Sequence, residues 1–203
     1  MSLLGRKTRW KAYSRAYRTE LWKSVISGRE RLFKKIAVES PLYLAHGTIL
    51  DVGTGPGRLP LLMTEGAPNV KCIGIDLEPI LLNDGRRKAL TTQAHNRPSF
   101  ILSDVQALPF RDQSFDMVIS TMSLHQWPNR QKGATELLRV LKDGGIAIIF
   151  VGRIQLYPGK VGIFDFVMRK SAKCLASIFE SAGFKDIKIT YPQFDLLKFV
   201  GRK

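Results

Sequence analysis

A regular alternation of short apolar segments with longer amphipathic segments is the feature that most constrains how this chain can fold. Five short segments have the length and composition of strands, at 47–52, 70–77, 98–104, 115–121 and 145–151. Helical patterns separate them, at about 57–66, from Pro79 onward and at 130–142. Strands that alternate with helices form parallel sheets. We therefore expect an α/β fold with a doubly wound parallel sheet.

The end of the chain departs from this alternation. A helix is predicted over 171–183, and two strands follow it directly, "DIKITY" at 186–191 and "FDLLKFVG" at 194–201. Two strands in succession favour a hairpin, here across "PQ" at 192–193, so the sheet is expected to close with an antiparallel strand. Residues 152–169 fit neither pattern.

An amphipathic helix is predicted near the start of the chain, over 8–27. Trp10, Tyr13 and Tyr17 recur there at three- and four-residue spacing, which is typical of one helix face. Gly28 is the expected end of this helix.

A second helix is expected over 29–39, ending before Pro41. Residues 1–40 are therefore predicted to form an N-terminal helical cap, and residues 41–203 to form a single domain.

The charge of the chain is strongly basic, with a net charge of +15 over 203 residues. Residues 1–40 hold 11 Lys and Arg against 3 Asp and Glu, and the remaining 163 residues hold 21 against 14. An excess of this size favours RNA, anionic lipid or another polyanion as a partner. A basic surface that only aids solubility is the alternative.

Some classes of protein and of site are disfavoured by the sequence. No segment approaches the roughly 20 apolar residues of a transmembrane helix, and the N-terminus lacks the apolar core of a signal peptide. We therefore expect a cytoplasmic protein. Cys72 and Cys174 lack the spacing of metal ligands, and the three histidines are scattered, so no metal site is predicted.

The segment "LDVGTGPG" at 50–57 joins a predicted strand to a predicted helix. A glycine-rich turn at this place lets a ligand approach the backbone and the helix N-terminus closely. The spacing does not fit a dinucleotide loop, because Arg58 stands where its third glycine would be, and no Lys-Ser/Thr pair follows as in a phosphate loop. Asp51, just before the glycines, suits a positively charged ligand.

Two further carboxylates follow the next two predicted strands, Asp76 in "GIDLEP" and Asp104 in "LSDVQALPF". The carboxyl ends of parallel strands share one edge of the sheet, and ligands bind at that edge. Each aspartate alone could be a helix cap. Three aspartates at the ends of successive strands, together with a glycine loop, indicate a binding site. An acid after the second strand suits ribose hydroxyls.

These segments together resemble the class I S-adenosylmethionine-dependent methyltransferases, and within them the small type 11 group. The resemblance covers about residues 45–190 and rests on five segments in this order: "DVGTGPG", "GIDLEP", "SDVQALPF", "FDMVIST" and "ELLRVLKDGGIAII". It implies a Rossmann-like, seven-stranded sheet with one antiparallel strand, and S-adenosylmethionine as the cofactor.

The resemblance also implies roles for individual residues. The methionine part of the cofactor would lie over the glycine loop, and its adenosine part beside the second and third strands. The implied cofactor-binding residues are Asp51, Gly53, Thr54, Gly55, Gly57, Asp76 (ribose hydroxyls), Leu77 (adenine), Asp104 and Val105 (adenine), Ser120 (backbone near the methionine part), and Tyr17 or Tyr13 from the N-terminal helix.

Three functions remain open from the sequence. A methyltransferase for a small or lipid-like acceptor is favoured by the resemblance and by the apolar character of 152–169. The alternative is a methyltransferase for RNA or a ribosome-associated protein, favoured by the charge. A third is a cofactor-binding regulatory protein without transfer activity. His125 is the one histidine at the predicted active edge and is a candidate substrate contact or general base.

Overall fold

The computed structural model describes residues 20–39, 42–152, 164–193 and 196–203. Its strands are β1 (Gly47–Val52), β2 (Val70–Asp76), β3 (Ser99–Leu102), β4 (Phe115–Thr121), β5 (Leu141–Gly152), β6 (Lys185–Gln193) and β7 (Leu196–Arg202). Its helices are α2 (Glu20–Glu39), α3 (Arg58–Gly66), α4 (Pro79–Thr91), α5 (Arg130–Val140) and α6 (Phe164–Ala182), with a short 3₁₀ turn, η2 (Leu124–Gln126).

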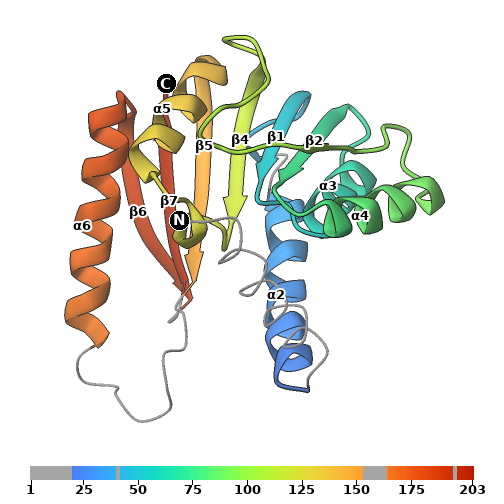
Figure 1. Cartoon of the computed structure of the whole chain (residues 1–203), viewed down its shortest axis with the longest axis horizontal. Coiled ribbons are helices and arrows are strands. Elements are labelled where there is room, and N and C mark those ends of the chain that lie inside the picture. Colours follow the sequence, from blue (N-terminus) through green and yellow to red (C-terminus); the bar gives the residue numbers. More distant parts are fainter. Residues whose placement is uncertain (1–19, 40–41, 153–163, 194–195) are drawn as a thin grey trace.

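The strands of the described part form one seven-stranded sheet in the order β3-β2-β1-β4-β5-β7-β6 (Figure 1). Strands β1 to β5 pair in parallel, and β7 runs antiparallel to both of its neighbours, β5 and β6. The fold expected from the alternation of strands and helices is therefore confirmed: a doubly wound, mostly parallel α/β sheet with one antiparallel strand.

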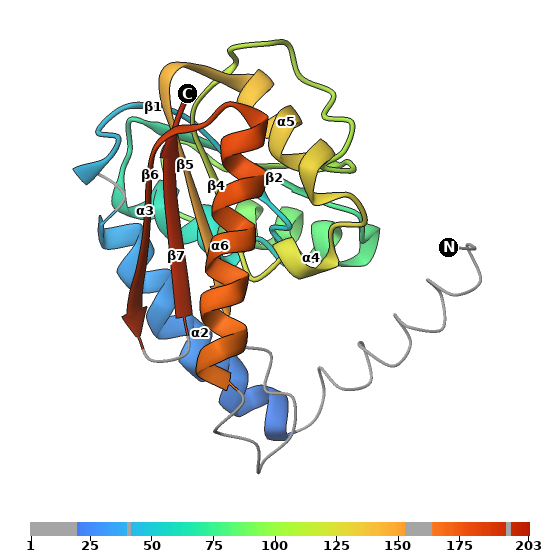
Figure 2. The same cartoon turned by 90° about the vertical axis from the view of Figure 1, so that its left-hand side faces the viewer.

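Helices cover both faces of the sheet, so its central strands are apolar on both sides, as parallel sheets require. On one face α5 and α6 pack against residues such as Ile149 and Phe199, and α6 runs along β7 and β6 (Figure 2). On the other face Leu32 and Ile36 of α2 join a second core cluster around Ile49.

The carboxyl ends of β1 to β5 meet at one edge of the sheet, because these five strands run in the same direction. In Figure 1 the arrowheads of β4 and β5 point toward this edge, and the first turns of α2 extend beyond it. In open α/β sheets this is the edge where ligands bind.

The predicted break in the N-terminal helix at Gly28 is wrong. Helix α2 continues through this residue from Glu20 to Glu39 and ends before Pro41, as expected. A glycine inside a helix costs only about 1 kcal/mol relative to alanine. The packing of α2 against α3 and the sheet outweighs that cost.

The predicted boundary between the helix at 130–142 and the strand at 145–151 is also wrong. Helix α5 ends at Val140, and β5 already begins at Leu141, which is fully buried and pairs with Phe115 of β4. A shift of register before Ile146 accommodates the intervening residues, including Gly144 with its φ of +74°. Strand pairing therefore overrides the local helical pattern here.

The closing hairpin is confirmed, but its turn is not at "PQ". Strand β6 continues through Pro192 to Gln193, which pairs with Leu196 of β7, so both residues of "PQ" belong to the strand. Pro192 is tolerated because β6 is the edge strand of the sheet and part of its ladder is unpaired.

Among the described helices, none combines the length and the apolar character needed to cross a bilayer. The cytoplasmic location stays a prediction. The division into a cap of residues 1–40 and a domain of residues 41–203 also stays a prediction, because residues 1–19 lie outside the described part.

Candidate functional site

The glycine loop lies between β1 and α3 at the carboxyl edge of the sheet. Gly53, Gly55 and Gly57 all have positive φ angles, of +73°, +55° and +72°. The N–H groups of Gly53 and Thr54 both donate to the carbonyl oxygen of Ile75, each at 2.9 Å. These two bonds tie the loop to the end of β2 and hold it in one shape.

Two glycines of the loop are required for different reasons. A Cβ on Gly57 would lie 2.4 Å from the ring of Phe100, so this residue permits close packing of α3 against β3. A Cβ on Gly55 would meet no atom closer than Leu81 Cδ1, at 4.0 Å. The outer side of Gly55 is therefore open, and a ligand could approach the backbone there.

Asp51 ends up buried beneath this loop, with 2% of its surface exposed. The hydroxyl of Thr54 donates to its Oδ2 at 2.7 Å. Burial raises the pKa of the Asp51 carboxyl to about 7; the Thr54 hydrogen bond opposes this shift and the neighbouring Asp76 adds to it. Asp51 is thus a buried carboxyl that titrates near neutral pH.

Asp76 lies at the end of β2, opposite the glycine loop. Its Oδ2 accepts the N–H of Gly55 at 2.8 Å and its Oδ1 accepts the N–H of Glu78 at 3.0 Å. Burial raises the pKa of Asp76, although these backbone hydrogen bonds oppose the shift. Leu77 and Ile80, just after it, expose 47% and 68% of their surfaces, so apolar side chains flank the carboxylate.

Asp104 follows β3, two residues past the end of the strand. Its Oδ1 accepts the backbone N–H of Gln106 at 2.9 Å, and the Gln106 amide nitrogen lies 3.1 Å from its Oδ2. The side chain of Val105 is buried in the core. The sheet order β3-β2-β1 therefore arranges Asp104, Asp76 and Asp51 along one edge, as expected.

The three aspartates at this edge have no cationic partner among the residues that the structure describes. In the described part of the chain, no Lys or Arg forms a hydrogen bond or an ion pair with any of the three aspartates. Buried carboxylates without a cationic partner are costly, and a bound cation relieves that cost. The site therefore suits a ligand that carries positive charge, hydroxyl groups and an apolar ring.

Ser120 and Ser123 connect the end of β4 to the glycine loop. The two hydroxyl oxygens lie 2.6 Å apart, and Ser123 Oγ also donates to the carbonyl oxygen of Val52 at 3.0 Å and accepts the indole N–H of Trp127 at 3.1 Å. Trp127 is buried under this turn. Ser123 was not singled out in the sequence, because nothing in "STMSLHQW" indicates which serine reaches β1.

The remaining predicted residues lie differently. His125 is an exposed residue of η2, next to the buried Leu124. Tyr13 and Tyr17 lie outside the described residues, so their predicted role is neither supported nor opposed. Cys72 is buried in the apolar core at β2, where burial raises its thiol pKa well above the usual value.

Helix α2 is attached to the site by an ion pair. Arg58, the first residue of α3, donates through Nε to Glu30 Oε2 at 2.9 Å, and its terminal nitrogen also contacts Glu30 Oε1. Two parallel bonds of this kind fix orientation as well as distance. The ion pair lowers the pKa of Glu30 and joins α2 to the residue that follows the glycine loop.

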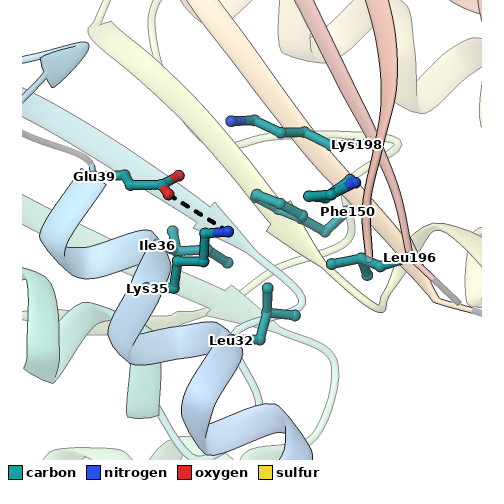
Figure 3. A pocket seen from close by; sticks show the side chains of 8 residues that line it. Leu32, Lys35, Ile36, Glu39, Phe150, Leu196 and Lys198 are labelled. Carbon is teal, nitrogen blue, oxygen red and sulfur yellow. Dashed lines mark ion pairs between the residues drawn. The ribbon is translucent and has the colours of Figure 1, made fainter. Parts of the chain in front are cut away.

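A shallow groove on the α2 face of the sheet is a separate feature (Figure 3). Leu32 and Ile36 of α2 face Phe150 and Leu196 of the sheet across it. Lys198 lies on the sheet side of the groove. The Lys198 ammonium contacts the hydroxyl of Tyr43 at 3.0 Å. None of the residues that line the groove belongs to the glycine loop or is one of the three aspartates.

Comparisons with known proteins agree on one family. The model of the family described as "Methyltransferase domain" matches residues 50–149. The demethylmenaquinone methyltransferase of Thermus thermophilus is 34% identical over 142 residues, which are 70% of this chain and 62% of that protein. The ubiquinone/menaquinone biosynthesis C-methyltransferase UbiE of Citrifermentans bemidjiense is 30% identical over 172 residues, 84% of this chain and 73% of that protein.

The fold has a counterpart among solved structures. An S-adenosylmethionine-dependent methyltransferase from Aquifex aeolicus superposes with a TM-score of 0.63 and 20% identity, over 85% of this chain and 97% of that chain. At this identity the likeness concerns the fold alone. The chain spans less than two thirds of the length of the Thermus thermophilus protein.

Proposed function

The chain belongs to the S-adenosylmethionine-dependent methyltransferases, and from this membership we propose that it transfers the cofactor's methyl group to a small, lipid-like acceptor of the quinone class. The observation that carries the proposal is the row of Asp104, Asp76 and Asp51 along adjacent strands, without a cationic partner in the described residues. The methionine part of the cofactor bears a sulfonium and an ammonium group, which Asp51 complements. Its adenosine part offers hydroxyl and amino donors, which Asp76 and Asp104 can accept.

The residues present suit the adenosine part of the cofactor. The two oxygens of Asp76 accept the backbone N–H groups of Gly55 and Glu78, and a carboxylate has further lone pairs that can accept ribose hydroxyls. The exposed side chain of Leu77 offers an apolar surface to the adenine. We assign Asp104 to the adenine amino group and the Val105 N–H to a ring nitrogen.

The methionine part is assigned to the other half of the site. The open side of Gly55 allows close approach, and the buried carboxyl of Asp51 faces the amino-acid end directly or through water. Gly53, Thr54 and Gly57 shape the loop beneath it, and Ser120 contributes backbone at the end of β4. The proposed role of Tyr17 depends on residues outside the described part.

The cofactor supplies a methyl group that is activated by its sulfonium and is transferred by in-line displacement. The protein's own part is then to align the two reactants and to exclude water. A general base is needed only where the acceptor carries a proton of high pKa. His125 on η2 is our candidate for that base.

The acceptor class is proposed from the relatives. Both curated relatives described above are named for quinone methylation, and one of them for methylation at carbon. The alternative acceptor, RNA or a ribosome-associated protein, rests on the net charge of +15. We therefore place the quinone class first.

The first experiment is titration calorimetry with S-adenosylmethionine and S-adenosylhomocysteine, with NAD as a negative control. We expect micromolar affinity for the first two. Asp76→Ala should weaken it about 100-fold, since it removes two hydrogen bonds to a charged group. Asp112→Ala is the matched control, because this exposed aspartate pairs with Arg139 away from the three strand ends, and it should bind as wild type does.

Turnover is then tested with reduced demethylmenaquinone of short side chain, followed by mass spectrometry of the product. Addition of one methyl group supports the whole proposal. Cofactor binding without any methylated quinone would overturn the acceptor class and favour a regulatory role or another acceptor. Absence of cofactor binding would overturn the whole proposal, including the methyltransferase activity.

A further inference from the structure

The hydroxyl of Thr121 is exceptional among the buried polar groups of the described residues. It is the one buried side-chain oxygen or nitrogen in that part of the chain without a hydrogen-bond partner. The residue exposes only 9% of its surface and is the last residue of β4, at the carboxyl edge of the sheet. A buried polar group in this state costs about 1–3 kcal/mol, so it requires an explanation.

Within the described residues, the side chains around Thr121 offer its hydroxyl no partner. Thr121 pairs in register with Phe150 of β5, and the ring of Phe150 points toward Ile36 of α2 (Figure 3). Its side chain therefore lies on the same face as Phe150 and Ile119, both of which belong to the apolar cluster beneath α2. The nearby polar group, the pair formed by Ser120 and Ser123, is already satisfied by Val52 and Trp127.

The position of Thr121 along the edge suggests what its partner is. In our assignment the adenine lies at β3, the ribose at β2 and the amino-acid end at β1. Thr121 lies on β4, the next strand in that order and on the side of β1 away from β2. An acceptor that meets the methyl group from beyond β1 would lie at the end of β4, of which Thr121 is the last residue.

We propose that Thr121 Oγ1 hydrogen-bonds an oxygen of the methyl acceptor, namely a ring hydroxyl or carbonyl beside the carbon that is methylated. This inference rests on the proposed function and adds an acceptor-binding residue to it. The hydroxyl gains its missing partner only when the acceptor is bound. Sites of this kind discriminate strongly against analogues that lack the hydrogen-bonding group.

The test compares Thr121→Val, which keeps the shape and removes the hydroxyl, with Thr121→Ser, which keeps the hydroxyl. The probes are 1,4-dihydroxynaphthalene and naphthalene, each titrated in the presence of S-adenosylhomocysteine. We expect wild type and Thr121→Ser to prefer the dihydroxy probe, and Thr121→Val to lose about 10-fold of that preference. The affinity of Thr121→Val for S-adenosylhomocysteine should stay within about twofold of wild type.

Thermal unfolding without ligand provides a readout that separates this role from a structural one. Because the hydroxyl has no partner, Thr121→Val should unfold at the same temperature as wild type or higher. A lower unfolding temperature would overturn the inference, since it would reveal a structural partner. An equal loss of cofactor affinity would also overturn it, by assigning the hydroxyl to the cofactor.

Failure of the inference is distinguishable from failure of the proposed function. If wild type binds S-adenosylhomocysteine but does not prefer 1,4-dihydroxynaphthalene over naphthalene, the role of Thr121 is rejected and the cofactor assignment stands. If wild type binds no cofactor, the proposed function falls, and this inference falls with it.

Discussion

Asp51 shows how one residue can couple cofactor binding to pH. Its carboxyl is buried, it receives one side-chain hydrogen bond, and its pKa is raised to about 7 mainly by burial. Near neutral pH the ligand-free molecules are therefore divided between the protonated and the ionised form of this group. A cationic ligand binds the ionised form better, so binding must release that proton.

The affinity for S-adenosylmethionine is accordingly expected to fall by more than about 10-fold between pH 7.5 and pH 5.5, as Asp51 takes up its proton. Calorimetry across this range, in two buffers of different ionisation enthalpy, measures both the affinity and the protons released. Asp51→Asn is the control and should bind weakly but with a flatter pH profile. A wild-type profile as flat as that of the variant would contradict the assignment of Asp51.

The same shift makes a prediction about stability in the absence of ligand. Because the pKa of Asp51 is raised on folding, the folded chain binds the proton more tightly than the unfolded chain between about pH 4 and pH 7. Stability from this group is therefore fully present at the acid end of that window and is lost as the pH rises through 7. Asp51→Asn should consequently unfold at a higher temperature than wild type at pH 8, and at a similar temperature near pH 5.

The predictability of single residues depends on whether their neighbours are close in sequence. Asp51, Asp76 and Asp104 could be found because each follows a strand whose pattern is visible, and a parallel sheet brings strand ends together. Ser123 and Thr121 could not be found in this way. Which of the two hydroxyls has a hydrogen-bond partner depends on the register between β4 and its neighbours, and no local sequence pattern indicates that register.

At the level of elements, the strands and helices were predicted well and their ends poorly. The start of α4 at Pro79 is confirmed, because proline at the first turn of a helix is a local signal. The end of α5 was missed, since Leu141 leaves the helix in order to pair with Phe115, which is distant in sequence. At Gly28 the helix was predicted to end, because glycine is a local stop signal, but the packing of α2 outweighs that signal and the helix continues.

The glycine loop allows binding and folding to be separated by two matched substitutions. Gly57→Ala places a Cβ against Phe100 in a left-handed conformation, so it should destabilise the chain by about 2 kcal/mol or more. Gly55→Ala meets open space and pays only the conformational cost, about 1 kcal/mol. Gly55→Ala should nevertheless weaken cofactor binding by more than about 10-fold, because the alanine side chain occupies the side of the loop that we assign to the cofactor.

Urea unfolding and calorimetry on both variants check this prediction. The cofactor interpretation of the loop predicts that Gly55→Ala is the more stable variant and the weaker binder per folded molecule. Full cofactor affinity in Gly55→Ala would show that the open side of the loop faces solvent and not the ligand.

At the scale of the whole molecule, the topology followed from the order of elements along the chain, since five alternating strands and a closing pair admit few arrangements. The chemistry of the acceptor did not follow, because methyl transfer requires alignment more than a recognisable catalytic group. Members of this fold differ in what they methylate, and the fold alone therefore leaves the acceptor open. The net charge of +15 is the remaining feature that bears on the choice.

Salt separates the two acceptor classes. A small apolar acceptor makes few contacts between charges, so its KM should change by less than about twofold between 50 and 200 mM KCl. An RNA partner held by 6–10 phosphate contacts would lose roughly 10³–10⁵ in affinity over the same range.

Steady-state kinetics with the reduced quinone measure the KM, and fluorescence anisotropy with a labelled ribosomal RNA fragment measures the RNA affinity, on one protein preparation. We expect the kinetics to be flat and the RNA signal to vanish by 200 mM, because binding that depends on charge alone is weakened steeply by salt. Sequence-selective RNA binding that survives 200 mM KCl, with methyl groups found in the RNA, would instead make the basic N-terminal region the acceptor-binding element.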